Sequence, residues 1–214
     1  MKRYILIACT LISFVTISHA QIKKGSVLLG GSIGVFNNTI TTETTESEIN
    51  SIILHPSIGV AIRDNWVVGL QAGLSRNWMK NENIQQQHES NFFSTGLYVR
   101  NYLPLGKKFY LYGQSDLSYL QSKFNITISS DEMRRSDMKG VSFTLTPGLT
   151  YAVNKRFHLE ASLNQLIAIS YTNTKMEHTT LAGKKLEEHK SFAFQSNFSS
   201  TNPLSIGFRF LLAR

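Results

Sequence analysis

The chain has 214 residues, a mass of 24.1 kDa, a formal net charge of +8 and a pI near 9.6. Hydrophobic residues make up 42% of it, charged residues 17% and aromatic residues 11%. This composition is too apolar and too aromatic for a disordered chain, and its four prolines exclude a Pro-rich linker. The length allows one domain, or two small ones.

The N-terminus has the features of a secretory signal peptide. Met1-Lys2-Arg3 is basic, Tyr4–Ile17 is apolar, and Ser18-His19-Ala20 places small residues before Gln21. This pattern predicts export with cleavage after Ala20, which leaves residues 21–214 as the mature domain. An exported protein rarely meets nucleic acid, and no long Lys/Arg run occurs, so we expect no nucleic-acid partner despite the basic pI.

Alternation of apolar and polar residues dominates the mature sequence. It is clearest over Ser51–Arg63, Trp66–Trp78 and Val141–Val153, and it predicts β-strands. The other predicted strands are Ser26–Asn37, Phe92–Leu103, Phe109–Gln121, Phe157–Tyr171 and a last one that ends at Leu212. The alternation loses its phase near Asn164-Gln165, which indicates a bulge. The last strand begins either near Ser191 or only after Pro203.

The connections alternate between short turns and long polar segments. The short ones are residues 63–65, 103–108 and 154–156; the long ones are Asn37–Asn50, Met79–Asn91, Ser122–Lys139 and Thr172–Lys190. Inside a bilayer every backbone polar group must be paired, so a spanning sheet has to close on itself. The sequence therefore predicts an all-β fold, an eight-stranded antiparallel up-and-down transmembrane β-barrel with long extracellular loops and short periplasmic turns.

The apolar face of the predicted strands carries aromatic residues near both ends. These form a predicted aromatic girdle at the two membrane interfaces: Trp66, Trp78, Phe109, Phe157, Phe208 and Phe210. Arg76 lies on the same face beside Trp78. We expect its side chain to extend to the interface and contact lipopolysaccharide phosphate.

The opposite face combines small residues with a few large polar ones. The predicted polar network of the barrel interior consists of Arg100, Asp116, Glu160, Arg209, Tyr98 and Tyr112. An unpaired buried charge is costly, so we expect Arg100 to pair with Asp116 and Glu160 to pair with Arg209. Eight strands enclose an interior just wide enough for side chains, which predicts a plugged core without a wide channel.

The charges of the mature chain are unevenly distributed. The four long segments hold nine Lys/Arg and eleven Asp/Glu, whereas a basic excess lies at the short-turn end. We expect the partners to be outer-membrane lipids and lipopolysaccharide, and the sequence does not name a ligand for the loops.

The sequence contains no convincing catalytic, cofactor or metal site. Cys9 is the only cysteine and lies in the signal peptide, so the mature chain has no disulfide and no thiolate. His158, Glu160 and Ser162 share one face of one strand, where side chains point out in a row rather than converge. We therefore expect no enzymatic activity, no cofactor and no metal.

Two segments resemble a known family. Tyr98–Gly113 reads YVRNYLPLGKKFYLYG and Asn202–Phe210 reads NPLSIGFRF. These strand–turn–strand and closing-strand patterns resemble the small outer-membrane β-barrel proteins of Bacteroidetes, a group similar to the OmpA-type transmembrane domain. The resemblance implies the outer membrane of a Gram-negative cell envelope and insertion by the barrel-assembly machinery.

Four functions are consistent with this sequence. The leading one is a non-enzymatic outer-membrane barrel with an envelope-structural role or a surface-interaction role through its loops. The others are a small porin-like pore or transport protein, an exported soluble lipocalin-like binder of apolar ligands, and a lipid A-modifying enzyme.

Overall fold

The computed structural model describes residues 22–41, 46–81, 86–129, 132–163, 165–180, 183–196 and 204–212. The predicted signal peptide and Cys9 lie outside these residues. The described residues form ten strands: β1 (Val27–Thr41), β2 (Glu46–Arg63), β3 (Trp66–Asn81), β4 (Gln86–Pro104), β5 (Phe109–Ser129), β6 (Glu132–Ala152), β7 (Phe157–Leu163), β8 (Ile167–Thr180), β9 (Gly183–Ser196) and β10 (Leu204–Leu212).

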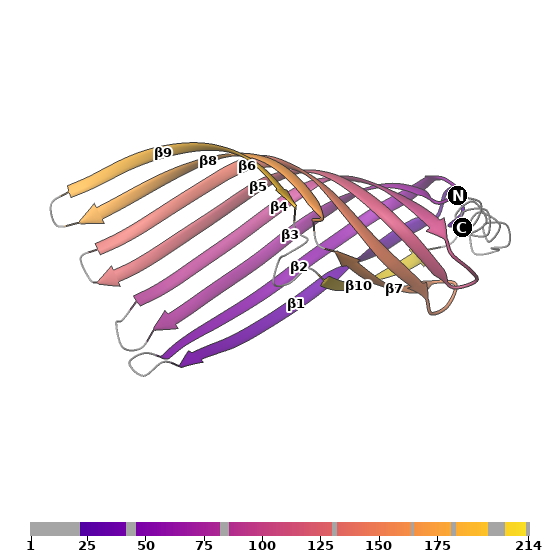
Figure 1. Cartoon of the computed structure of the whole chain (residues 1–214), viewed down its shortest axis with the longest axis horizontal. Coiled ribbons are helices and arrows are strands. Elements are labelled where there is room, and N and C mark those ends of the chain that lie inside the picture. The colour runs from indigo at the N-terminus through magenta and orange to yellow at the C-terminus, as the bar shows by residue number, and fades with distance from the viewer. Residues whose placement is uncertain are drawn as a thin grey trace, which may run out of the picture.

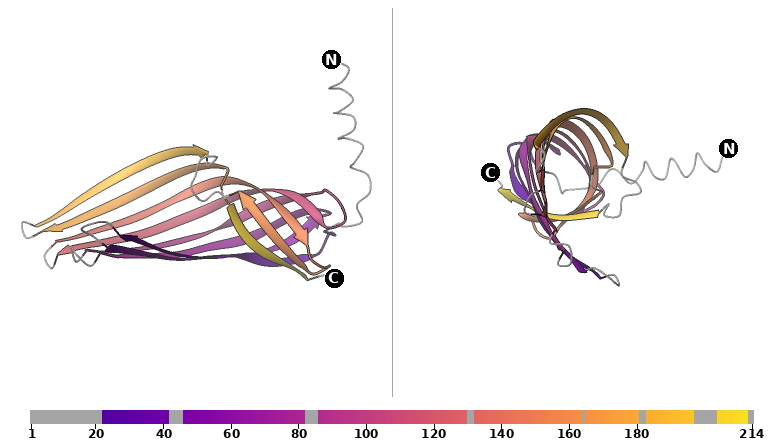
Figure 2. Two further views of the ribbon diagram at one scale, coloured as in Figure 1. Left: turned by 60° about the horizontal axis from the view of Figure 1, so that its bottom comes forward. Right: turned by 90° about the vertical axis from the view of Figure 1, so that its left-hand side faces the viewer.

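Eight of these strands close into an antiparallel ring. β1 to β7 pair in sequence order, and β10 lies between β7 and β1. The ring closes where Val27–Ser32 of β1 pairs with Gly207–Leu212 of β10. Figure 2 shows this ring in its right-hand view, along the barrel. The prediction of an all-β, closed, eight-stranded antiparallel barrel is confirmed.

The predicted strand Phe157–Tyr171 is in fact two strands, β7 and β8. Both pair with β6, but Gly148 lies opposite Ser162 whereas Leu145 lies opposite Ile167, so the register shifts by two residues. Gln165, between the two strands, has a φ of 46°. The phase loss seen in the sequence thus marks a real break, but the second strand runs on to Thr180, well beyond the predicted end.

The last predicted strand is also divided. The two starting points considered from the sequence correspond to two strands, because β9 contains Ser191 and β10 begins just after Pro203. β9 pairs with β8 and extends the sheet beyond the ring, while β10 completes the ring.

The four long segments predicted as loops are mostly strand. The hairpins β1–β2, β3–β4, β5–β6 and β8–β9 extend far beyond the ring, as the left side of Figure 1 shows. The segments predicted as long loops form paired hairpins over most of their length, because strand pairing needs only backbone groups. Polar pairs such as Thr39 opposite Glu48 and Asn125 opposite Arg135 keep the ladder without apolar side chains.

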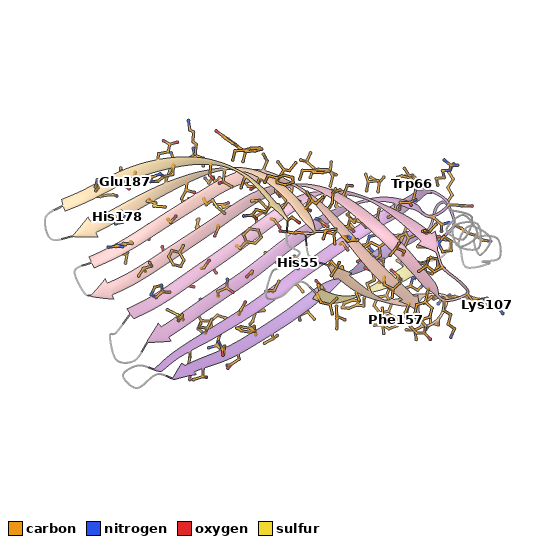
Figure 3. All side chains as sticks on the ribbon, in the orientation of Figure 1. His55, Trp66, Lys107, Phe157, His178 and Glu187 are labelled. Carbon is orange, nitrogen blue, oxygen red and sulfur yellow. The ribbon has the colours of Figure 1, made fainter. Side chains whose placement is uncertain are left out.

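Apolar side chains cover the outside of the barrel. Outward-facing Leu70, Leu97 and Leu117 are 55–59% exposed, and the side chains in Figure 3 project outward along the whole ring. The six predicted girdle residues also face outward, with Trp66, Phe109, Phe208 and Phe210 each at least 38% exposed. A lipocalin-like barrel would turn its apolar face inward, so this arrangement argues against that alternative. Among the described residues, no helix is long and apolar enough to cross a membrane.

The short-turn end of the ring is filled. Ile22, Leu28 and Val67 are fully buried there and pack with four interior tyrosines. The turn between β2 and β3 helps to hold the N-terminal segment, because the Ile22 backbone N–H donates to Asn65 Oδ1 at 3.1 Å. Asn65 has a φ of 64°, a conformation that asparagine tolerates.

Candidate functional site

The centre of the barrel holds three charged side chains from three strands. Arg100 comes from β4, Glu160 from β7 and Arg209 from β10. Arg100 Nη1 lies 2.7 Å from Glu160 Oε1. Arg209 Nε and Nη2 lie 2.9 Å and 3.3 Å from Glu160 Oε1 and Oε2, so this contact is bidentate. All three residues are at most 8% exposed. We call these three residues the charged plug.

Tyrosines surround the charged plug. Arg100 Nη1 donates to the Tyr102 hydroxyl at 3.0 Å, and Arg209 Nη1 donates to the Tyr98 hydroxyl at 3.3 Å. The Arg100 guanidinium also lies 4.0 Å from the centre of the Tyr112 ring. These contacts supply hydrogen bonds and a cation–π interaction to charges that are almost completely buried.

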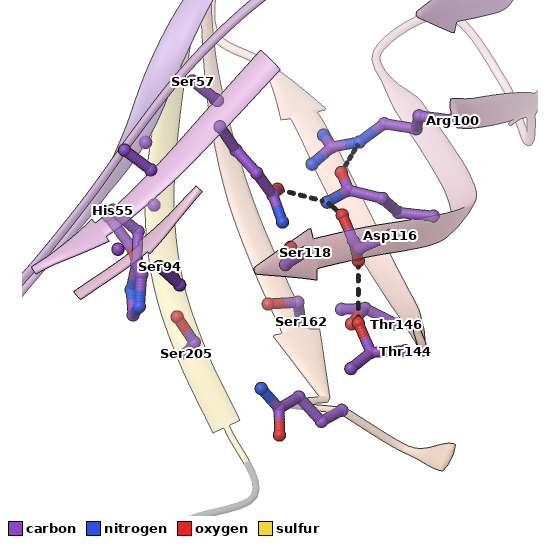
Figure 4. A pocket seen from close by; sticks show the side chains of 18 of the residues that line it. His55, Ser57, Ser94, Arg100, Asp116, Ser118, Thr144, Thr146, Ser162 and Ser205 are labelled. Atoms are coloured by element: carbon purple, nitrogen blue, oxygen red, sulfur yellow. Dashed lines mark hydrogen bonds between the residues drawn. The ribbon is translucent and has the colours of Figure 1, made fainter. Parts of the chain in front are cut away.

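A glutamine joins the charged plug to Asp116. Arg100 Nε donates to Gln114 Oε1 at 2.6 Å, and Gln114 Nε2 donates to Asp116 Oδ1 at 2.6 Å, as the dashed lines in Figure 4 mark. Thr144 Oγ1 donates to the other carboxylate oxygen at 3.0 Å. The expected direct pair between Arg100 and Asp116 therefore does not form. Glu160 contacts both arginines instead.

The network contains four residues besides the six predicted from the sequence: Tyr102, Gln114, Gln71 and Thr144. Gln71 Oε1 accepts from Gln114 Nε2 at 3.0 Å, and Thr144 binds Asp116. Both lie on the polar side of an alternating strand, so the sequence indicates that they face the interior. Their partners depend on strand register, which the alternation alone does not determine.

A polar cavity of about 190 Å³ borders the charged plug on the side of the long hairpins, the direction called above from here on. We call it the vestibule. Hydroxyl, amide and imidazole groups dominate its wall, among them those of Ser32, His55, Ser94, Ser142, Thr146 and Ser205. Ser32 Oγ lies 3.4 Å from His55 Nδ1. Figure 4 shows Arg100 and Asp116 on one side of this space and His55 with Ser94 on the other.

The β2–β3 ladder is interrupted beside His55. It skips His55 and Pro56, because proline has no N–H to donate. A Cβ on Gly73 would lie 3.0 Å from the His55 ring. The absence of a side chain at this glycine leaves room for the imidazole inside the barrel.

On the short-turn side of the charged plug, aromatic side chains fill the barrel interior. The Tyr102 and Tyr110 rings meet edge to face with centroids 6.1 Å apart, and Tyr110 stacks on His158 at 5.9 Å. Both tyrosines are at most 3% exposed. The interior is thus a polar vestibule above two closed layers of side chains.

Arg76 lies on the outer face, as its position in the alternation requires. Its Nη2 lies 2.7 Å from Glu89 Oε1, and the two side chains are 65% and 41% exposed. The residue predicted to contact lipopolysaccharide thus has a carboxylate partner on the neighbouring strand.

The histidines of the β8–β9 hairpin lie beside acidic and basic side chains. His189 Nε2 lies 3.6 Å from Glu187 Oε2, and a hydrogen bond from Lys185 lowers the pKa of Glu187. Figure 3 places His178 and Glu187 at the far end of the molecule from Trp66 and Lys107. Within the described ranges, no three histidine or carboxylate side chains gather as a metal ion requires.

A closed antiparallel barrel that is apolar outside and charged inside is the architecture of an integral outer-membrane protein. The chain belongs to the outer membrane protein β-barrel domain family, whose model matches residues 6–185. This membership places the protein in the outer membrane.

Three solved structures are similar to this chain at low sequence identity. The outer membrane protein OprG from Pseudomonas aeruginosa has a TM-score of 0.50 and 14% identity, over 90% of this chain and 98% of that one. A major outer membrane protein from Thermus thermophilus gives 0.49 and 12%, over 91% and 100%. The translocator domain of the autotransporter NalP from Neisseria meningitidis gives 0.45 and 9%, over 98% and 94%. A search of curated proteins found no match.

Proposed function

We propose that this protein is a non-enzymatic, non-conducting outer-membrane barrel that serves the cell envelope as a structural element and meets the outside through its long hairpins. In the proposed membrane orientation the long hairpins face outward and the short turns face the periplasm. There Lys23, Lys107 and Lys155 meet anionic phospholipid headgroups. Insertion by the barrel-assembly machinery and a Bacteroidetes origin belong to the same proposal, and both rest on the resemblance of the sequence.

The charged plug is the observation that carries this proposal. An open channel needs a continuous water-filled path, and here Arg100, Glu160 and Arg209 are 5%, 8% and 2% exposed. Their contacts link β4, β7 and β10 directly across the interior. Moving them aside would leave buried charges without partners, which is strongly unfavourable.

Conductance of the purified barrel in a planar lipid bilayer tests the proposal. We expect no stable nanosiemens-scale channel from the wild-type protein. A stable open channel in the wild-type protein would contradict the proposal.

The contacts of Glu160 also support a non-enzymatic role. Some small barrels modify lipids with Ser, His and Glu side chains, but both carboxylate oxygens of Glu160 are bound by arginine here. His158 stacks on Tyr110 below the charged plug, and Ser162 lines the vestibule above it. A mass shift of lipid A in cells that express the protein would contradict this part of the proposal.

A second candidate function is passage or capture of a small polar solute, and the vestibule favours it. Its hydroxyl and amide groups suit a hydrophilic molecule, and its volume of about 190 Å³ suits a small one. Passage, unlike capture, requires both the charged plug and the aromatic layer on its short-turn side to open. Solute uptake by proteoliposomes would separate the candidates, because only a transport protein releases the solute on the inner side.

A further inference from the structure

The strand register places four lysines together on the outer face of the barrel. The outward positions of β5, β6, β8 and β9 include Lys123, Lys139, Lys175 and Lys190. Lys123 lies opposite Asp137 and Lys139 lies opposite Asn173. Lys190 also lies opposite Asn173. We call these four residues the lysine zigzag.

Each lysine of the zigzag is a diagonal neighbour of the next. Asp137 of β6 lies opposite both Lys123 of β5 and Lys175 of β8. Lys139 is two residues from Asp137 along β6, so it is the diagonal neighbour of both lysines. Diagonal neighbours in antiparallel strands are about 7–8 Å apart, within reach of long side chains. One phosphate can therefore contact two successive lysines of this series.

Two carboxylates offset half of the charge of the lysine zigzag within the described part of the chain, because Asp137 lies opposite Lys123 and Lys175, and Glu188 lies opposite Lys175. None of its four ammonium groups forms an ion pair there, whereas the nearby Arg76, Lys184 and Lys185 each pair with a glutamate at 2.7 Å. The carboxylates next to the zigzag are those of Asp137 and Glu188, and Glu188 Oε1 already accepts from Asn173 Nδ2 at 2.7 Å. Neighbouring like charges repel one another, so this arrangement favours an external anion.

The residues directly below the zigzag are those of a membrane interface. Tyr119, Val141, Tyr171 and Phe192 form the next outward row, and they are 41–71% exposed. The following outward row is Leu117, Phe143, Ile169 and Phe194. An aromatic row between an apolar band and a charged row is typical of the headgroup level of a bilayer. An anion at the zigzag would therefore belong to a lipid.

An apolar groove begins beside the zigzag. It has a volume of about 500 Å³ and is lined by Ile52, Leu54, Leu74 and Phe93, with Arg76 and Lys123 above them. A hydrocarbon chain fits such a groove while its phosphate lies against the basic residues at the top.

From these observations we propose that the lysine zigzag binds the phosphate groups of a phosphorylated glycolipid of the outer leaflet, whose acyl chains cover the aromatic and apolar rows below. The proposal uses the membrane orientation stated under the proposed function. It does not depend on whether the barrel conducts. Conductance can therefore contradict the proposed function without contradicting lipid binding, and a lipid titration can contradict lipid binding alone.

Lipid titration of the purified, folded barrel in a nonionic detergent tests this site. The probes are bisphosphorylated lipid A and the same lipid after enzymatic removal of its phosphates. The test variant carries Lys123→Gln, Lys139→Gln, Lys175→Gln and Lys190→Gln. A matched control removes four exposed basic residues near the ends of the β5–β6 and β8–β9 hairpins: Arg134→Gln, Arg135→Gln, Lys184→Gln and Lys185→Gln.

We expect each substitution in the zigzag to weaken binding of bisphosphorylated lipid A about fivefold, as about 1 kcal/mol per basic residue implies. The control variant should bind like the wild-type protein, and the dephosphorylated lipid should bind equally weakly to all three proteins. The double variant Lys139→Gln, Lys175→Gln gives the same comparison with less change to the fold. Equal loss of affinity in test and control variants, or equal binding of the dephosphorylated lipid by the wild-type protein, would overturn the proposal.

Discussion

Arg100 and Glu160 are 60 residues apart in the sequence, yet their side chains meet at 2.7 Å inside the barrel. Arg209 reaches the same carboxylate from β10, so one glutamate holds two arginines. The contact ties three strands of the ring together at its centre. It stabilises the closed barrel only as a complete set, because each member is buried.

Removing the carboxylate should therefore be costly. Glu160→Gln leaves two buried arginines without a counter-charge, and we expect a loss of about 3–5 kcal/mol in the free energy of unfolding. Urea unfolding of the barrel in lipid vesicles measures this. The matched control is Glu89→Gln, which breaks the exposed pair with Arg76 and should cost at most about 1 kcal/mol. Similar losses in both variants would show that water solvates the charged plug.

The folded barrel should resist SDS until it is heated. Protein from washed outer membranes should migrate faster unboiled than boiled, because the closed hydrogen-bonded ring stays compact in the cold detergent. Gel mobility of the two samples measures this directly. A soluble periplasmic protein with no mobility shift would contradict the membrane assignment.

The position of the membrane can be tested with a charge on the outer face. Leu117→Arg places a cation in the apolar band and should destabilise the barrel in vesicles by about 2–4 kcal/mol. Leu186 of β9 also faces outward and is 70% exposed, against 59% for Leu117, but it lies on the far side of the lysine zigzag. Leu186→Arg should have little effect, and an equal loss at both positions would place the membrane elsewhere.

Gly69 occupies a position where no side chain fits. An added Cβ would meet the Ile58 backbone oxygen and would lie 2.6 Å from the Tyr98 ring. Gly69→Ala should destabilise the barrel by about 1–3 kcal/mol, because backbone and ring both have to shift. Gly113→Ala is the control, since nothing lies within 4 Å of its added Cβ. Equal stability of the two variants in urea unfolding would mean that the wall at Tyr98 is loosely packed.

The alternation of residues was sufficient to predict which side chains face inward. Arg100, Asp116, Glu160 and Arg209 all lie in the interior, because the period of two assigns each strand position to a face. The partner of each charge was harder to predict. Whether Arg100 meets Asp116 or Glu160 depends on how strands distant in sequence align, and alternation is unchanged by a shift of two residues.

The extent of the hairpins could not be predicted for a related reason. Residues such as Thr39, Glu48, Asn125 and Arg135 carry no apolar pattern, so the sequence favoured loops. In the structure their backbones pair because the hairpin below has already aligned the strands. The break at Gln165 was visible as a loss of phase, but the continuation of β8 to Thr180 was not.

The seam between β1 and β10 holds only six residue pairs, whereas β4 and β5 share eighteen. The β6–β7 pairing is shorter still, with five residue pairs, so opening of the wall should start on this side of the ring, at the seam or between β6 and β7. Amide hydrogens of Val27–Ser32 that bond across the seam should exchange with deuterated solvent sooner than those in the middle of β4. The two edges of the seam are the first and the last strand of the described residues, so the ring remains incomplete until β10 has reached β1.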